Sequence, residues 1–317
     1  MSETTRNRLL NILRVGISLV GVLVIVLTQD MDEVIRLLSE MDWLLFLVGL
    51  LLFVFSVPVR AYRWGSLVWA LDVQARWWRL VALYFVGSFF NLFLPTGFGG
   101  DAVKMFELSR DEHKAAAAIS SVLVDRFLGL FVLFALALLA LLGGRELVAP
   151  EVRLLIVVVF AVSLIGVILL LQRTWIEAWG RRLGVDRLLG RIKILRELYE
   201  SLHIYGPAAL LKATSASLVF NLILILGYYF LGLAVSIHLP LWYYFLFVPI
   251  ISVLLLVPSV GGLGIREGAT VFLFSQLESV GRSQALALAL AYDMTMLTIG
   301  LIGAIIYIVQ GVKGVRK

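Results

Sequence analysis

Hydrophobic residues are grouped along this chain into long runs that contain almost no charge, such as 43–59, 128–142 and 154–171. A helix needs about 20 mainly apolar residues to cross the ~30 Å hydrocarbon core of a bilayer. Helices suit lipid because they satisfy their own backbone hydrogen bonds. The pattern therefore predicts an all-α integral membrane protein with no room for a soluble catalytic domain. We expect eight hydrophobic segments, at about 12–28, 43–70, 79–94, 115–142, 152–171, 207–236, 241–257 and 283–310.

Composition supports this interpretation and excludes several classes of function. The 317 residues are 61% hydrophobic and 15% charged, whereas a soluble domain carries roughly 25% charged residues. The absence of cysteine excludes disulfides, thiolate catalysis and Cys-ligated metals. The three histidines lie far apart in the sequence, and none belongs to an HExxH pair. We therefore expect no enzymatic activity, no cofactor and no metal site.

The first apolar run resembles a signal peptide because three arginines precede it. It ends at Thr28-Gln29-Asp30, however, without a small-x-small cleavage site. We expect it to be a retained membrane span.

The net charge of +6 is interpreted as a record of membrane orientation, not of nucleic-acid binding, because the bases lie between hydrophobic segments. If the third and seventh segments enter the membrane and return to the same side, 21 of the 27 Lys and Arg residues are cytoplasmic. If the third segment crossed fully, the Arg-rich stretch 172–196 would face outward. The excess of Lys and Arg on cytoplasmic loops of membrane proteins disfavours that topology. The pattern predicts about six full spans plus two re-entrant hairpins in the cell membrane. Both termini and the 172–206 connection would then be cytoplasmic.

Two Pro- and Gly-rich breaks follow the third and seventh segments, one from Pro95 to Lys104 and the other from Pro258 to Glu267. Under the predicted topology, the halves of a single transmembrane domain, about 1–145 and 150–317, are inverted repeats. Transporters often build a midplane site from such paired, interrupted segments. The matching positions, 162 residues apart, are Gly99 and Gly100 with Gly261 and Gly262, and Lys104 with Arg266.

The residue types in these breaks suit an anion. Proline ends a half-helix, and glycine allows a tight turn and close approach to a ligand. A new half-helix then presents its free N–H groups and positive dipole end, with Lys104 or Arg266 in its first turns. A single break of this kind is usually a kink or a close helix contact. Two matched breaks, each followed by a base, favour a phosphate-binding site.

Further charged residues lie within or beside the apolar segments. Asp125 and Arg126 lie near the middle of one segment, where they either fix helix packing as an ion pair or face a cavity. Asp293 has no neighbouring base, so it is a candidate partner for Arg126, Lys104 or Arg266, or a proton carrier. We expect Glu107 and Glu267 to pair with the neighbouring bases.

Other residues have structural interpretations. Arg60 and Arg63 close the second segment, and extension of their side chains to the headgroups would explain them. Asn91 and Asn221 are expected to form interhelical hydrogen bonds. An interfacial aromatic belt is predicted from Trp64, Trp69, Trp77, Trp78 and Trp242.

These motifs resemble the transmembrane domain of lysylphosphatidylglycerol synthases, whose stand-alone relatives are flippase-like proteins. The resemblance is carried by Asn91 to Lys104, Val124-Asp125-Arg126 and Pro258 to Gly268, and it covers nearly the whole chain. Its most specific element is Gly-Gly-x-Gly-x-Arg-Glu-Gly. It implies a lipid translocase fold, places the family's charged positions on Lys104, Asp125-Arg126 and Arg266-Glu267, and allows a homodimer.

Two departures from the family pattern change what the resemblance implies. The aminoacyl-transferase domain is absent, so we do not expect this chain to make lysyl-lipid. Tyr292-Asp293 stands where relatives are expected to have Tyr-Arg, which indicates a different headgroup.

The sequence thus favours transbilayer movement of an anionic or phosphate-bearing lipid, or of a lipid-linked intermediate, through a midplane cavity. No nucleotide-binding motif is present, so gradients or coupled ions would drive it. The alternative is a secondary transporter of a small soluble anion, because the same half-helix geometry would serve.

Overall fold

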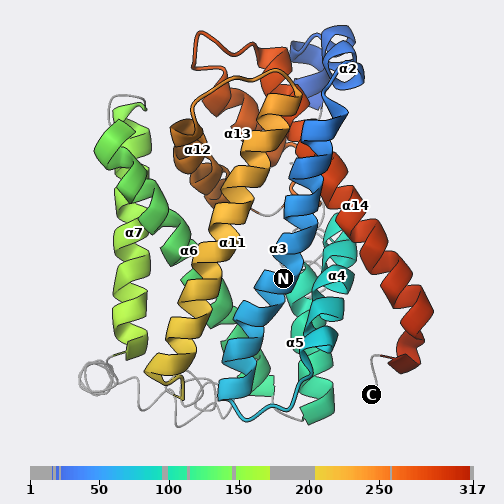
Figure 1. Ribbon diagram of the computed structural model, residues 1–317, viewed down its shortest axis with the longest axis vertical. Helices are drawn as coiled ribbons and strands as arrows, with labels where there is room; N and C mark the ends of the chain where they lie inside the picture. Colours follow the sequence, from blue (N-terminus) through green and yellow to red (C-terminus); the bar gives the residue numbers. More distant parts are fainter. Residues whose placement is uncertain are drawn as a thin grey trace, which may run out of the picture. The chain divides into compact units, whose positions relative to one another are not determined.

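The computed structural model describes residues 16, 19–20, 23–94, 99–112, 115–144, 148–171, 204–257 and 259–314, and their regular structure is entirely helical (Figure 1). The fold class predicted from the hydrophobic pattern is confirmed in this respect. The helices are α2 (Met31–Ser39), α3 (Trp43–Ala70), α4 (Trp77–Phe93), α5 (Gly99–Glu112), α6 (Ala115–Gly144), α7 (Pro150–Leu171), α11 (Pro207–Ala234), α12 (Leu241–Leu254), α13 (Ile265–Phe274) and α14 (Arg282–Gly314).

Five of the described helices, α3, α6, α7, α11 and α14, are long and apolar enough to cross a membrane. They coincide with five of the six predicted full spans. Of the other predicted span, over 12–28, the structure describes residues 16, 19–20 and 23–28, and these are helical. Lipid-facing character is clearest on α7, where exposed apolar side chains recur along the helix. These are Leu154, Val157, Val158, Val162, Ile165 and Ile168.

The third and seventh hydrophobic segments form helices that are shorter than a regular span. α4 has 17 residues and α12 has 14, below the roughly 20 needed to cross the hydrocarbon core. Each is followed by another short helix, α5 or α13, and α12 packs against α13 (Figure 1). Residues 95–98 and Pro258, which belong to the two breaks, lie outside the described residues. So does the predicted cytoplasmic connection, apart from 204–206.

The chain forms two compact units whose segments alternate along the sequence. The first contains residues 1–55, 85–100 and 223–309, and the second contains 56–84, 101–222 and 310–317. Five of the described helices contribute residues to both units: α3, α4, α5, α11 and α14.

In the first unit, α3 and α11 approach closely because glycine lies at their contact. A Cβ on Gly227 would come within 2.7 Å of the Phe53 ring, and a Cβ on Gly49 within 2.9 Å of Leu231. Small residues at helix contacts permit such packing in membranes. The Phe53 ring also packs edge-on against Tyr228 and Tyr292, whose own rings stack at 4.6 Å. These contacts place aromatic rings beside one of the two charged clusters described below.

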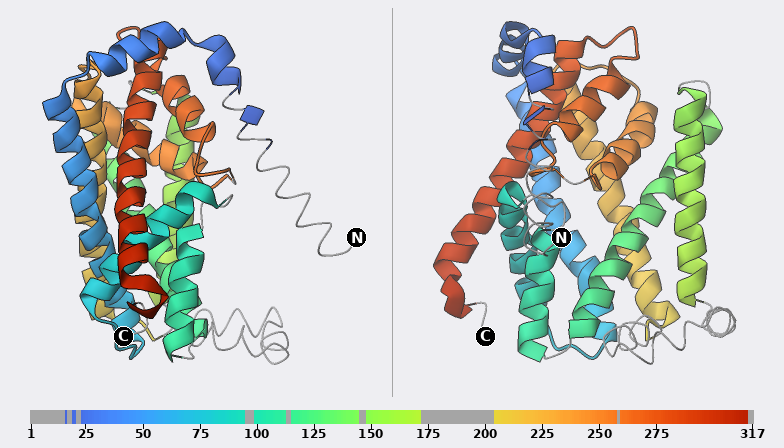
Figure 2. Two further views of the ribbon diagram at one scale, coloured as in Figure 1. Left: turned by 90° about the vertical axis from the view of Figure 1, so that its right-hand side faces the viewer. Right: turned by 180° about the vertical axis from the view of Figure 1, so that it is seen from behind.

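In the second unit, α6 and α7 pack side by side (Figure 2), and α3 and α6 are joined by polar contacts. Trp64 is fully buried, and its indole N–H donates to Ser121 Oγ at 3.1 Å. Its predicted place in an interfacial belt is therefore wrong, because a buried indole N–H is satisfied inside the protein. The Asn221 amide on α11 donates to the Gly129 carbonyl on α6 at 3.2 Å, which confirms the predicted interhelical hydrogen bond.

The short helix α2, which hydrophobic runs alone do not predict, begins at a polar cap. The Asp30 side chain accepts a hydrogen bond from the Glu33 amide at 3.1 Å, a standard helix start. On its exposed face Arg36 pairs with Glu33 at 2.7 Å. Hydrogen bonding to Arg36 lowers the pKa of Glu33.

Candidate functional site

Charged side chains that the apolar helices bury form two clusters, one in each compact unit. The α5 cluster, in the second unit, consists of Arg60, Arg63, Tyr84, Asp101, Lys104, Asp125 and Arg126. The α13 cluster, in the first unit, consists of Tyr228, Arg266, Glu267, Tyr292 and Asp293. Charged groups at membrane depth are expensive and usually mark functional sites.

At the centre of the α5 cluster, Arg63 on α3 forms a bidentate ion pair with Asp125 on α6. Arg63 Nε donates to Oδ1 at 2.6 Å and Nη2 to Oδ2 at 2.8 Å. The Tyr84 hydroxyl donates to Oδ2 at 3.1 Å. The exposed fractions of Arg63 and Asp125 are 4% and 2%. The expectation that Arg63 extends to the headgroups is therefore wrong, because a buried carboxylate holds it.

Asp101 connects two further bases of the α5 cluster. Its Oδ1 lies 2.6 Å from Lys104 Nζ, and its Oδ2 accepts a hydrogen bond from Arg126 Nε. Arg126 thus pairs with Asp101 on α5, and not with its neighbour Asp125. Sequence reasoning did not select Asp101 as a site residue. Its position three residues before Lys104 was a usable signal, because such residues share one helix face.

Aromatic rings surround the bases of this cluster. Lys104 Nζ lies 4.1 Å from the centre of the Tyr84 ring and 5.3 Å from that of Trp64. The Arg60 guanidinium lies 5.0 Å from Tyr84 and 5.2 Å from Phe220 on α11. Such cation–π contacts stabilise a charge where water is scarce.

The α5 cluster carries more positive than negative charge. The cluster contains four bases, which are Arg60, Arg63, Lys104 and Arg126, and two carboxylates, which are Asp101 and Asp125. Two buried donors, Arg60 Nε and Arg63 Nη1, have no hydrogen-bond partner in the part of the chain that the structure describes. Glu107 does not offset this surplus: it is half-buried on α5, and no ion pair joins it to another described residue. The surplus favours an anionic ligand.

The first glycine pair allows α4 and α5 to pack closely. A Cβ on Gly100 would lie 2.6 Å from the Gly87 carbonyl oxygen, and one on Gly99 would lie 2.8 Å from Leu94. The Gly100 amide donates to the Asn91 side chain at 2.6 Å, as expected for an interhelical asparagine. One N–H at the start of α5 is therefore satisfied inside the protein, whereas the motif predicted free amides there.

In the α13 cluster, Arg266 pairs with Asp293 on α14, one of the three partners considered from the sequence. Arg266 Nη1 donates to Asp293 Oδ1, and Nη2 donates to the Gly261 carbonyl at 3.1 Å. The guanidinium lies 4.8 Å from the centre of the Tyr292 ring. Arg266 is 8% exposed.

The second glycine pair forms a turn that favours glycine. Gly261, Gly262 and Gly264 have φ angles of +61°, +85° and +82°, a region that other residues rarely adopt. The Glu267 side chain accepts a hydrogen bond from the Gly264 amide at 2.6 Å and thereby caps α13. Glu267 was expected to pair with a neighbouring base, and instead it satisfies the backbone.

The two breaks are therefore not equivalent in structure. Gly99 and Gly100 begin helix α5, whereas Gly261 and Gly262 precede α13. Lys104 is the sixth residue of α5, and Arg266 is the second residue of α13.

The α13 cluster also differs from the α5 cluster in charge, because two carboxylates face one base. Glu267 Oε1 and Asp293 Oδ2 are buried, and neither oxygen accepts a hydrogen bond from a base or a backbone amide of the described residues. This cluster favours a proton or a cation over an anion.

Comparison with known proteins gives two matches. A family model described as "Lysylphosphatidylglycerol synthase TM region" matches residues 11–303. The chain is also similar to the UPF0104 membrane protein PH1989 of Pyrococcus horikoshii, with 24% identity over 190 residues. That match covers 59% of this chain and 55% of the relative, so the aligned part spans about half of the relative's length. No solved structure matches the chain.

Proposed function

Since the chain belongs to the family of the lysylphosphatidylglycerol synthase transmembrane region, we propose that it moves a phosphate-bearing lipid between the leaflets of the cell membrane. The observation that carries the proposal is the surplus of positive charge in the α5 cluster. Lys104 and Arg126 share Asp101 there, and Arg126 keeps 35% of its side chain exposed. A phosphate group would balance the surplus, because guanidinium and ammonium donors bind phosphate oxygens strongly.

In this mechanism the lipid phosphate competes with Asp101 for Lys104 and Arg126. At each base a phosphate oxygen takes the place of an Asp101 oxygen, so Lys104 and Arg126 each keep a negatively charged partner throughout. The α4–α5 and α12–α13 segments act as re-entrant hairpins of an inverted pair, with both termini cytoplasmic. Once a proton has neutralised one carboxylate of the α13 cluster, Arg266 takes the phosphate in the opposite-facing state, after exchange from Asp293, with the Gly99-Gly100 and Gly261-Gly262 backbones close to the headgroup.

The α13 cluster supplies the coupling in this proposal. Two buried carboxylates beside one guanidinium leave one negative charge unbalanced, and a proton on Glu267 or Asp293 would remove it. The other ionisable groups that face them are Arg266, Tyr292 and Tyr228. Protonation of Asp293 itself weakens the Arg266–Asp293 pair and thereby frees the base for the phosphate.

The test is lipid translocation by the full chain in proteoliposomes. Fluorescent phosphatidylglycerol would be followed by quenching of the outer leaflet, in wild type and in Lys104→Ala and Arg266→Ala. The matched control is Arg153→Gln on α7, a base outside both clusters. We expect both cluster variants to lose most of the activity and the control to keep it.

Translocation that survives both cluster substitutions unchanged would overturn the proposal. Uptake of radiolabelled phosphate or sulfate, with no movement of lipid, would instead establish the small-anion transporter, for which the same cluster charges would serve.

A further inference from the structure

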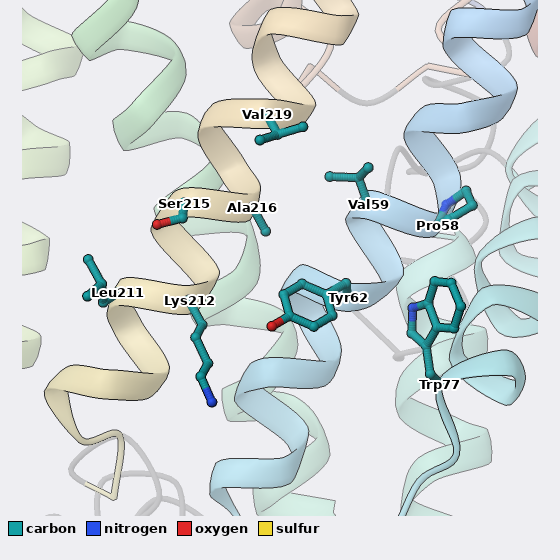
Figure 3. A pocket seen from close by; sticks show the side chains of 9 residues that line it. All are labelled: Pro58, Val59, Tyr62, Trp77, Leu211, Lys212, Ser215, Ala216 and Val219. Carbon is teal, nitrogen blue, oxygen red and sulfur yellow. The ribbon is translucent and has the colours of Figure 1, made fainter.

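A groove lies between α3 and α11 in the second unit, outside both charged clusters (Figure 3). Its volume is about 560 Å³, within the ~300–1,000 Å³ typical of small-molecule sites. The residues that line it are Pro58, Val59, Tyr62, Trp77, Leu211, Lys212, Ser215, Ala216 and Val219.

The polar groups of the groove lie toward one end of it. Lys212 is on the second turn of α11, and its side chain and the Tyr62 ring point into the space between the helices (Figure 3). Trp77 is the first residue of α4, and among the described residues its buried indole N–H has no hydrogen-bond partner. Lys212 is exposed and forms no ion pair with another described residue. Between α3 and α11 this end therefore offers an ammonium and a phenol, which can both donate to an anion.

The other end of the groove is apolar. Val59 on α3 faces Ala216 and Val219 on α11, about one helical turn beyond Tyr62 and Lys212, and Pro58 lies on the other side of α3 in this view (Figure 3). Apart from Ser215, this part contains only hydrocarbon side chains. A phosphate-binding end near the helix ends and an apolar end deeper along them match the two parts of a phospholipid.

We propose that this groove binds an anionic phospholipid, with one acyl chain between α3 and α11 and the phosphate on Lys212 and Tyr62. The charge complementarity of Lys212 selects an anionic headgroup over a zwitterionic one.

The groove lies next to the α5 cluster, which gives the bound lipid a role. Arg60 follows Val59 on α3, and Phe220 follows Val219 on α11; the Arg60 guanidinium and the Phe220 ring are 5.2 Å apart. A lipid in the groove is therefore separated from the cluster by one guanidinium–aromatic contact. The groove would hold the lipid before its headgroup enters the α5 cluster. This role rests on the proposed translocase function, whereas lipid binding itself does not.

The test uses the full chain in vesicles that contain phosphatidylglycerol with a photoactivatable diazirine in one acyl chain. Labelled peptides would be identified by mass spectrometry. We expect labelling within 58–62 and 211–219. Val219→Trp fills the groove and should abolish this labelling, whereas Val162→Trp on the lipid-facing side of α7 should leave it unchanged.

A second comparison tests the headgroup. Lys212→Gln should reduce labelling by phosphatidylglycerol about fivefold, the effect of one base near an anionic lipid, and should leave labelling by a phosphatidylcholine probe unchanged. Arg153→Gln, in the first turn of α7, is the control. Labelling equally strong on α7, or unaffected by Val219→Trp, would overturn the proposal.

The two proposals fail in different ways. Groove labelling without any translocation would leave the lipid site standing and overturn the translocase. Translocation that depends on Lys104 but occurs without groove labelling would overturn the groove site alone.

Discussion

The Arg63 guanidinium on α3 donates two hydrogen bonds, of 2.6 and 2.8 Å, to the Asp125 carboxylate on α6. Both side chains are almost fully buried. The two residues are 62 positions apart in the sequence, so their ion pair joins two separate helices. A planar guanidinium matches a carboxylate in this geometry, and lysine could not replace it. The pair anchors the α5 cluster, where Tyr84 also bonds to Asp125.

Asp125→Asn is expected to destabilise the protein by about 3–5 kcal/mol, because it leaves the Arg63 charge buried without a counter-charge. The measurement is thermal or denaturant unfolding of the purified protein in mild detergent. The double variant Arg63→Leu/Asp125→Leu is the control, since it removes both charges. It should be more stable than either single leucine variant, and additive losses would contradict a coupled pair.

Gly129→Ala tests the space that the Arg63 side chain needs. A Cβ on Gly129 would come within 2.7 Å of Arg63 Nη1, so the guanidinium must shift, and a shift disturbs its two hydrogen bonds to Asp125. We expect a loss of about 1–3 kcal/mol, as for other overpacked sites. Gly268→Ala on α13 is the matched control, because a Cβ there meets nothing within 4 Å. It should gain roughly 0.5–1 kcal/mol from helix propensity. Equal effects of the two substitutions would show that the Arg63 side chain does not need the space beside Gly129.

Asp101→Asn removes the carboxylate that neutralises Lys104 and Arg126. Retention of phosphatidylglycerol in detergent should rise roughly tenfold, since a hydrogen bond to a charged group contributes about 1.5–3 kcal/mol. Native mass spectrometry of the purified protein would measure it. Translocation should fall, because the lipid is held too tightly to leave. Weaker retention in a folded variant would show that Asp101 does not compete with the ligand.

Glu267 is expected to combine a structural and a coupling role that two substitutions separate. Glu267→Gln keeps an acceptor for the Gly264 amide and should preserve stability, whereas Glu267→Ala should cost about 1 kcal/mol through loss of the cap. In proteoliposomes with an imposed pH gradient, Glu267→Gln should translocate lipid at a rate that no longer depends on the gradient. Gradient dependence like that of the wild type would remove Glu267 from the coupling site.

The exposed Glu33–Arg36 pair on α2 should contribute little to stability. The Arg36 side chain lowers the pKa of Glu33, so any stabilisation is present above the carboxylate's unfolded pKa and is lost as the pH falls. Both side chains are solvated and screened by salt. The melting temperature of Glu33→Gln should therefore equal that of the wild type at pH 7, in low and high salt. A clear drop would indicate that α2 is held by charge.

Hydrophobic runs alone were enough to predict the helical membrane fold and the bounds of most helices. The segment expected over 43–70 coincides with α3, and the one over 207–236 differs from α11 by two residues at its end. This succeeds because lipid offers the backbone no partners, so a long apolar run has one stable form. The helix α2 was missed because its nine residues begin at a polar cap and include several charged side chains, so they form no long apolar run.

Sequence also indicated which charges matter, because a buried charge within an apolar run is costly wherever it occurs. Lys104, Asp125, Arg126, Arg266 and Asp293 all lie in the two clusters. Which charge meets which was decided by tertiary structure alone. Adjacent residues on a helix point about 100° apart, so Asp125 and Arg126 face different neighbours. Their partners, Arg63 and Asp101, lie on other helices, and only packing brings those side chains within hydrogen-bonding distance.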